Sequence, residues 1–308
     1  MTARELRVGI DIGGTKTDAV AIAHDGHIVE QLRLPTGFGP AEVVDTAVAA
    51  VTSLAKLAGT TIDGFASIGI GIPGAVDNGT VSHAVNLGLE GLNLGAELSA
   101  RLGRPVRIDN DVNAAALGAF HLLETHPTHS LAYLNLGTGL AAGLVLGGSL
   151  WRGSRGTAGE IGHIPVDPAG QPCACGQRGC LETVASGSAI ARQWPTDDPK
   201  PARALFAAAA AGDALAIEVK ARLIDNVAAA ARILVLTVDV DSVVIGGGLS
   251  SLGPELLADV VAVLESWEAA SPFLASIDLS ERVHIVPAGF PAAAVGAALV
   301  GAALAGVG

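Results

Sequence analysis

The sequence is short of the residues that mark several protein classes. Of 308 residues only three are cysteine, and the aromatic residues are six Phe, three Trp and one Tyr. A small, odd number of cysteines argues against a secreted scaffold held by disulfides. The first residues, MTARELRVGIDIGG, contain no apolar stretch before a cleavage site, so no signal peptide is predicted. We therefore expect a cytoplasmic protein.

Basic residues are also scarce. Lys and Arg number 18 against 30 Asp and Glu, which gives a formal charge of −12 at pH 7. Nucleic-acid and anionic membrane surfaces need clustered Lys and Arg, so neither partner is expected. A local site for a phosphorylated ligand remains compatible with this balance. The most membrane-like segment, residues 291–308, is rich in Ala and Gly, and we expect a soluble helix there.

Apolar residues and glycine are abundant instead. Half of the residues are hydrophobic and 16% are charged, which leaves ample apolar surface to bury and excludes a disordered chain. Glycine accounts for 40 residues, without a three-residue period and with only 15 prolines, so collagen is excluded. The length allows one large domain or two of ordinary size.

Strand and helix patterns alternate along the chain, which predicts an α/β architecture. Expected strands cover 6–12, 19–23, 65–72, 106–108, 131–136, 143–146, 242–245 and 283–286. Expected helices cover 41–58, 94–102, 112–122, 202–211, 213–236, 254–269 and the C-terminal segment. The long irregular stretch 153–187 contains all three cysteines, and a loop of that length is normally functional or held by something.

One internal repeat stands out. Gly9–Ile22 and Tyr133–Leu146 share the order strand, Gly/Thr turn, strand, with an offset of 124 residues. Repeated units half a chain apart indicate two related domains that face each other. Two glycine turns that face across a cleft could hold one phosphate chain from both sides.

The first of these turns, DIGGTK at residues 11–16, is the stronger phosphate candidate. Its glycines let backbone N–H groups converge on phosphate oxygens, and its Thr and Lys add donors. Asp11 could hold Mg²⁺ at the strand end. The alternative is a hairpin turn with an exposed lysine, but the second copy at 136–139 favours phosphate binding. The G-x-G-x-x-G match at 69–74 is rejected as a dinucleotide motif because a turn, not a helix, follows it.

A polar cluster, Asp109-Asn110-Asp111-x-Asn113, lies between a short strand and a helix. Asp111 could be the N-cap of that helix, which would be a sufficient structural role. The functional alternative is a general base that removes the proton of a hydroxyl as it attacks phosphorus, as in kinases. Asn110 could hydrogen-bond neighbouring hydroxyls.

The cysteine segment carries the most specific signal. His163, Cys173, Cys175 and Cys180 lie within 18 residues, and three Cys with one His form an accepted structural zinc set. Free buried thiols or a redox pair are the alternatives, although Cys173 and Cys175 are awkwardly placed for a mutual disulfide. We predict a structural metal site, which would fix the direction of the Glu160 and Glu182 carboxylates.

Together these motifs resemble the ROK family (repressors, open reading frames and kinases) of the actin-like ATPase superfamily. The most specific stretch runs from Gly159 to Glu182, and the resemblance covers nearly the whole chain. It implies an α/β fold with two actin-like (ribonuclease H-like) domains and an interdomain cleft. The expected domains are residues 1–115, completed by a helix at 293–308, and residues 116–292 with the zinc-binding loop. A homodimer or homotetramer is expected by the same resemblance.

The resemblance implies an ATP-dependent hexose kinase that phosphorylates the sugar 6-hydroxyl, with glucose as the first expectation. Its cofactors would be ATP, Mg²⁺ and structural Zn²⁺, with Asp111 as the base. The implied sugar contacts are Asn86, Asn110, Asp111, Glu160, His163 and Glu182. The implied nucleotide and phosphate contacts are Asp11, Gly13, Gly14, Thr15, Lys16, Thr138, Gly139, Gly246, Gly247 and Gly248. The implied zinc ligands are His163, Cys173, Cys175 and Cys180.

The sequence departs from the family pattern at Leu89–Asn93, which lacks the Trp often found there. Kinases of N-acetylmannosamine, N-acetylglucosamine, mannose, allose or fructose are therefore alternatives. Some members of the family are repressors with an N-terminal helix-turn-helix, but here only residues 1–5 precede the first expected strand. A sugar sensor that does not bind DNA is the remaining alternative, and Asp111 with both phosphate turns counts against it.

Overall fold

The computed structural model describes residues 6–123, 126 and 129–302. The chain divides into two compact units, the first from residues 1–127, 148–156 and 291–308, the second from residues 128–147 and 157–290. The boundary expected at 115/116 falls inside helix α3 (Asp111–Leu122). The whole of α3 belongs to the first unit because it packs along α9 (Ala292–Ala302).

The first unit is built on a five-stranded sheet of order β3-β2-β1-β4-β8. Its strands are β1 (Arg7–Ile12), β2 (Lys16–Ile22), β3 (Ile28–Pro35), β4 (Ser67–Ile72) and β8 (Val106–Asn110). The β1–β2 and β2–β3 pairs are antiparallel, and β1–β4 and β4–β8 are parallel. A small second sheet, β5 (Ala75–Asp77), β6 (Thr80–Ser82) and β7 (Leu92–Asn93), follows β4, so a strand and not a helix comes after the 69–74 motif.

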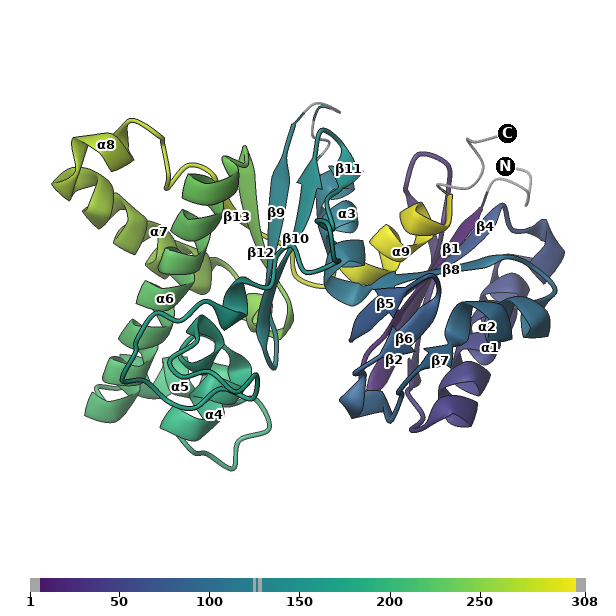
Figure 1. The fold of residues 1–308 in the computed structure, drawn as a ribbon, viewed down its shortest axis with the longest axis horizontal. Helices are drawn as coiled ribbons and strands as arrows, with labels where there is room; N and C mark the ends of the chain where they lie inside the picture. The colour runs from purple at the N-terminus through teal and green to yellow at the C-terminus, as the bar shows by residue number, and fades with distance from the viewer. Residues whose placement is uncertain (1–5, 124–125, 127–128, 303–308) are drawn as a thin grey trace. The chain divides into compact units, whose positions relative to one another are not determined.

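Glycine and isoleucine alternate along β4 and stand side by side at Gly9 and Ile10 of β1, and in both strands each type faces a different layer. Ile10 and Ile70 are fully buried in the core that includes α1 (Pro40–Leu57) and α2 (Leu94–Leu102). Gly9 and Gly69 face α9 on the other side (Figure 1), where a Cβ atom at Gly9 would lie 1.9 Å from the Ala294 carbonyl oxygen. The backbone of α9 therefore rests directly on the sheet.

Helices α3 and α9 also touch backbone to backbone. A Cβ atom at Gly296 would lie 1.6 Å from the carbonyl oxygen of Ala114, and one at Gly118 would lie 2.0 Å from that of Ala292. Because α9 is buried against both the sheet and α3, it is apolar on all sides. The remainder of the helix expected at 293–308, residues 303–308, lies outside the described residues. No helix in the described part of the chain has the length and apolarity that a membrane span requires.

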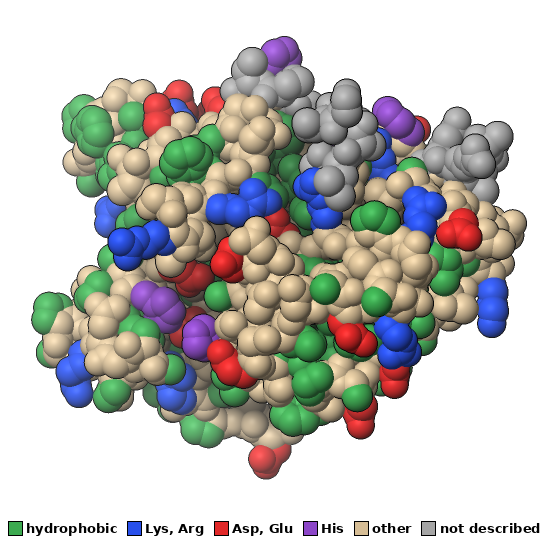
Figure 2. Space-filling view, turned by 45° about the vertical axis from the view of Figure 1, so that its right-hand side comes forward, with side chains coloured by type: hydrophobic (Ala, Val, Ile, Leu, Met, Phe, Trp, Pro, Cys, Tyr) green, Lys and Arg blue, Asp and Glu red, His purple; other side chains and the backbone are tan. Residues whose placement is uncertain are grey.

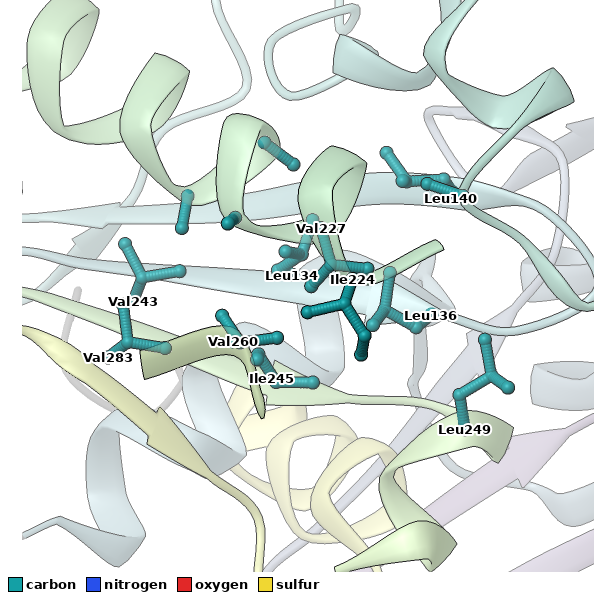
Figure 3. Close-up of a cluster of buried hydrophobic side chains, with 14 of the residues drawn as sticks. Leu134, Leu136, Leu140, Ile224, Val227, Val243, Ile245, Leu249, Val260 and Val283 are labelled. Atoms are coloured by element: carbon teal, nitrogen blue, oxygen red, sulfur yellow. The ribbon is translucent and has the colours of Figure 1, made fainter. Parts of the chain in front are cut away.

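The second unit has a sheet of order β11-β10-β9-β12-β13. The strands of this sheet that belong to the second unit are β9 (Leu131–Leu136), β10 (Leu140–Leu146), β12 (Ser242–Gly246) and β13 (Val283–Ile285), while the short edge strand β11 (Ser149–Leu150) belongs to residues 148–156 of the first unit. Its helices are α4 (Gly187–Gln193), α5 (Pro201–Ala210), α6 (Ala214–Val238), α7 (Pro254–Ala270) and α8 (Pro272–Ala275). In the core shown in Figure 3, Ile224 of α6 and Val260 of α7 pack near Leu134 and Ile245 of the sheet.

The predicted repeat corresponds to the same element in each unit. Gly9–Ile22 forms the antiparallel hairpin β1–β2, and Tyr133–Leu146 forms the antiparallel hairpin β9–β10. In each sheet a parallel strand, β4 or β12, pairs with the first strand of the hairpin. The mixed α/β fold with two related units is therefore confirmed.

Acidic and basic side chains are interspersed on the face of the molecule shown in Figure 2.

The crossing of α3 and α9 predicts a specific sensitivity. Ala usually stabilises a helix relative to Gly by about 1 kcal/mol. In Gly296→Ala, however, the new methyl group would overlap the Ala114 carbonyl, so we expect the free energy of unfolding to fall by about 2 kcal/mol or more in urea titrations. Gly248→Ala is the control, because a Cβ atom there has no neighbour within 4 Å. Equal stability of the two variants would contradict the packing described here.

Candidate functional site

Three carboxylates gather at one end of the first sheet. Asp11 of β1 pairs with Gly71 of β4, and Gly71 pairs with Asp109 of β8, so all three positions share one face. Gly71 has no side chain, and a Cβ atom there would lie 3.4 Å from the Cα atom of Asp111. The first residue of α3 therefore lies over the middle strand, close to the other two acidic residues.

This arrangement changes the proton affinity of Asp11. Burial and then the charge of Asp111 raise the pKa of Asp11 from 3.8 to about 8. The facing carboxylate, Asp18, is already held by Arg33, with Nε 2.5 Å from Oδ1 and Nη2 3.1 Å from Oδ2. Asp11 is thus a carboxylate that a bound cation would stabilise in its charged form.

Asn110, rather than Asp111, caps helix α3. Its Oδ1 accepts hydrogen bonds from the backbone N–H groups of Val112 (2.9 Å) and Asn113 (3.2 Å), and its Nδ2 donates to the Gly74 carbonyl (3.1 Å). Asp111 is the first helical residue and is half-buried, with Oδ1 3.0 Å from the Val112 nitrogen. Because Asn110 fills the capping role, the capping alternative for Asp111 is wrong.

The first glycine turn is short and open. The Gly13 N–H donates to the Lys16 carbonyl at 3.0 Å, while the side chains of Thr15 and Lys16 are exposed. Asn86, from the 3₁₀ helix Val85–Leu87, lies beside this turn, since a Cβ atom at Gly14 would lie 3.2 Å from its Cβ atom. The predicted phosphate turn and the predicted sugar contact Asn86 are therefore neighbours.

The second glycine turn is anchored by a helix that the sequence did not predict. The Gly137 N–H donates to the Gly139 carbonyl at 3.0 Å. The carbonyls of Gly137 and Thr138 in turn accept hydrogen bonds from Gly187 (2.8 Å) and Ser188 (3.1 Å), the first residues of α4. This leaves the Thr138 side chain exposed at the tip of the turn.

A cavity of about 490 Å³ connects this turn with Gly248. Its volume lies in the range usual for small-molecule sites. Apolar side chains form one part of its wall, and backbone and hydroxyl groups form another, as a nucleoside would require. The lining residues are Gly137, Thr138, Gly187, Ser188, Ile190, Ala191, Pro199, Lys200, Pro201, Ala202, Arg203, Gly248, Leu249 and Ser251.

The three glycines at 246–248 have different environments. Gly246 is packed against the Tyr133 ring, and the Gly247 N–H donates to the Tyr133 hydroxyl at 3.0 Å. Gly247 has φ 79°, a conformation that favours glycine. Of the three, Gly248 lines the cavity, while Gly246 and Gly247 pack closely against residues of β9.

The four predicted metal ligands come together. The ligand atoms of His163, Cys173, Cys175 and Cys180 all lie within 4.8 Å of one another. The Cys175 and Cys180 sulfurs are 3.7 Å apart, and the Cys173 sulfur is 3.7 Å from His163 Nδ1. Tetrahedral zinc with Zn–S bonds of about 2.3 Å places two sulfurs about 3.8 Å apart, so this set fits zinc.

The thiols of this cluster differ in pKa. Hydrogen bonds from the Gln177 backbone and side chain lower the pKa of Cys175 to about 6. Burial, followed by the neighbouring thiols, raises the pKa of Cys180 to about 12. The exposed Cys175 therefore forms a thiolate readily, and a bound zinc ion would hold the buried Cys180 as a thiolate too.

The two carboxylates that bracket the cysteine loop are placed differently. Glu160 is exposed, with Oε2 4.0 Å from Nε2 of His163, the ring nitrogen that points away from Cys173. Glu182 Oε2 accepts a hydrogen bond from the Leu140 N–H at 2.9 Å and lies against Gly139. Glu160 thus borders the Cys/His cluster, and Glu182 borders the second glycine turn.

Each unit therefore carries its own set of the predicted residues. The first unit contains Asp11, Gly13–Lys16, Asn86, Asn110 and Asp111, and the second contains Thr138, Gly139, Glu160, Glu182, the four metal-ligand candidates and Gly246–Gly248. The remaining lining residues of the cavity, including the wall at 199–203, carry no motif and were not predicted.

This combination of two related α/β units is the two-domain actin-like fold, and solved structures with that fold superpose on it. A ROK hexokinase from Thermus thermophilus matches with a TM-score of 0.81 and 32% identity, covering 98% of this chain and 100% of that chain. A ROK family glucokinase from Streptomyces griseus, in complex with glucose and AMPPNP, matches with a TM-score of 0.77 and 30% identity, covering 96% and 99%.

Sequence comparison agrees. The profile of the ROK family matches residues 7–302, and the chain belongs to this family. A curated glucokinase from Halalkalibacterium halodurans is 34% identical over 281 residues, which cover 84% of this chain and 85% of that protein.

Proposed function

We propose that this protein is an ATP-dependent hexose kinase that transfers the γ-phosphate of ATP to the 6-hydroxyl of glucose. Membership of the ROK family and the similarity to a curated glucokinase over most of both chains support this activity. The structural observation that carries the proposal is the cavity of about 490 Å³ that joins the Gly137–Thr138 turn to Gly248. Its mixed wall and volume suit the nucleoside part of ATP.

Asp111 is the proposed general base. It removes the proton of the sugar 6-hydroxyl as that oxygen bonds to the γ-phosphorus, and the bond from phosphorus to the β,γ-bridging oxygen breaks to release ADP. Its position at the first turn of α3 is fixed by the Asn110 cap and by the close approach to Gly71. Asp111 would therefore abstract the proton from a fixed position on a rigid helix.

The other sugar contacts are proposed from the family resemblance. Asn86, Glu160, His163 and Glu182 offer amide, carboxylate and imidazole groups to the sugar hydroxyls. Because both lone pairs of Asn110 Oδ1 are engaged by the helix cap, Asn110 would contact the sugar through its Nδ2 group.

The phosphate groups are assigned to Gly13–Lys16 and to Thr138 and Gly139, whose backbone N–H groups, hydroxyls and ammonium group are donors. Asp11 would hold Mg²⁺, which neutralises phosphate charge when bound. The raised pKa of Asp11 fits this role, because a neighbouring cation favours the charged carboxylate.

We further propose that the Cys/His cluster holds one structural zinc ion. His163, Cys173, Cys175 and Cys180 would close the coordination sphere and leave no position for catalysis. The ion would fold the loop that carries Glu160 and Glu182. By the family resemblance, the enzyme is proposed to be a cytoplasmic homodimer or homotetramer without a nucleic-acid or membrane partner.

The central experiment is a coupled assay with ATP over a panel of hexoses that includes glucose, mannose, fructose, allose and the N-acetylated amino sugars. Wild-type protein should turn over glucose. Asp111→Asn should lower kcat by roughly 10²- to 10⁴-fold because the amide cannot accept the proton. Absence of turnover on every sugar would refute the kinase proposal, and sugar binding without turnover would indicate a sensor. Wild-type rates in Asp111→Asn would remove Asp111 as the base.

The nucleotide assignment of the cavity can be tested separately. Ala191→Trp places a large side chain in its wall, and we expect KM for ATP to rise by about tenfold with little change in KM for the sugar, since only nucleotide binding is obstructed. Ala221→Trp is the matched control, because Ala221 lines a different cavity of the same unit. If both variants keep the wild-type KM for ATP, the nucleotide binds elsewhere.

Metal analysis by mass spectrometry should find about one zinc per chain in freshly prepared protein. Cys175→Ser should lose the metal because it removes one of the four ligands. Gln177→Ala should keep it, since Gln177 donates hydrogen bonds to the His163 carbonyl and the Cys175 sulfur but supplies no ligand atom. Metal-free wild-type protein, or full zinc content in Cys175→Ser, would contradict the assignment.

A further inference from the structure

Asp109 has no role in the motifs described so far, yet it is the most enclosed carboxylate near the proposed base. It lies two residues before Asp111, and its side chain is only 8% exposed. Its Oδ1 accepts hydrogen bonds from the Asn110 N–H (2.9 Å) and from Asn113 Nδ2 (3.3 Å). These two donors belong to the cap and the first turn of α3, so one oxygen of Asp109 is bound to the start of the helix that carries Asp111.

The other oxygen of Asp109 pairs with Arg152. Arg152 lies in residues 148–156, which we call the connecting segment. This segment is part of the first unit, whereas the residues directly before and after it belong to the second unit. The Arg152 side chain is about half exposed, at 47%, and its Nη2 group contacts Asp109 Oδ2. A single buried carboxylate therefore joins the connecting segment to the first turn of α3.

A buried carboxylate without a partner is strongly unfavourable, and Asp111 brings further negative charge to this end of the sheet. The Arg152 guanidinium supplies the compensating positive charge. Without it, Asp109 would have to draw in water or rotate away, and either change would move its hydrogen bonds to Asn110 and Asn113. The orientation of Asp111 is thus physically coupled to an arginine that is distant in the sequence.

We propose that Asp109 and Arg152 are positioning residues for phosphoryl transfer: the pair fastens the connecting segment to the β8–α3 junction and thereby orients Asp111 toward the sugar hydroxyl. This inference rests on the proposed kinase function and deepens it. The pair acts through Asp111 and contacts no reacting atom. It therefore affects the rate of the chemical step more than the binding of either substrate.

The test uses the full-length protein and compares kcat with both KM values. Arg152→Gln should lower kcat by about tenfold or more, with each KM within about threefold of wild type, because a small displacement of a reacting group is costly. Arg152→Lys should recover most of that loss. The double variant Asp109→Asn/Arg152→Gln should lose no more than Asp109→Asn alone, since both changes break one interaction.

Arg155→Gln is the matched control, because it removes an exposed arginine from the same connecting segment and should leave kcat unchanged. A kcat of Arg152→Gln within twofold of wild type, or additive losses in the double variant, would overturn the proposal. So would an equal loss of kcat in Arg155→Gln.

Hydrogen exchange provides a readout that does not need turnover. In Arg152→Gln the amides of residues 110–113 should exchange faster than in wild type, although the substitution is about 40 residues away in the chain. In Arg155→Gln they should not. If the wild-type protein phosphorylates no hexose, the proposed function fails, and hydrogen exchange alone then tests the structural role of the Asp109–Arg152 pair. Faster exchange at residues 110–113 supports the proposal that the pair holds the start of α3 in place, and unchanged exchange overturns it.

Discussion

The first unit depends on the direct contact between the backbone of α9 and its neighbours. Glycines on β1, β4, α3 and α9 remove the side chains that would otherwise hold these elements apart: a Cβ atom at Gly296 would lie 1.6 Å from the Ala114 carbonyl oxygen. Close contact of this kind leaves no room for adjustment by side-chain rotation, so the relative positions of the sheet and the two helices are narrowly determined. Gly9, Gly69, Gly118, Gly296 and Gly301 follow from this one requirement.

The position of the proposed base is a consequence of that packing. Helix α3 is held by α9 along its length, and Gly71 lets its first turn approach the sheet where β1, β4 and β8 end. The same approach brings Asp111 close to Asp11, and burial together with this neighbouring charge raises the pKa of Asp11, while the buried Asp109 is paired with Arg152. The site therefore combines rigid geometry with a carboxylate whose charged form a bound cation would stabilise.

Local patterns in the sequence predicted much of this architecture. Helix α2 and strand β9 have the expected bounds, and the zinc-type spacing of His163 and the cysteines correctly anticipated that their ligand atoms meet. Strand β3 was missed because exposed and partly buried residues alternate along it, without the apolar run that marked β1. The cavity wall at 199–203 was missed for another reason: its residues meet Gly248 only through tertiary packing. The pairing of Asp109 with Arg152 is likewise a long-range contact between residues of ordinary type.

The place of α9 in the chain also bears on how the protein is made. Residues 292–302 complete the packing of the first unit, but they are synthesised after every residue of the second unit. On the ribosome, the usual order in which an N-terminal domain folds first is therefore reversed: residues 128–147 and 157–290 can form their core while the first unit still lacks a central helix. The half of the molecule that carries Asp111 acquires its close packing last, so a nascent chain does not assemble this carboxylate site before residues 292–302 have been synthesised.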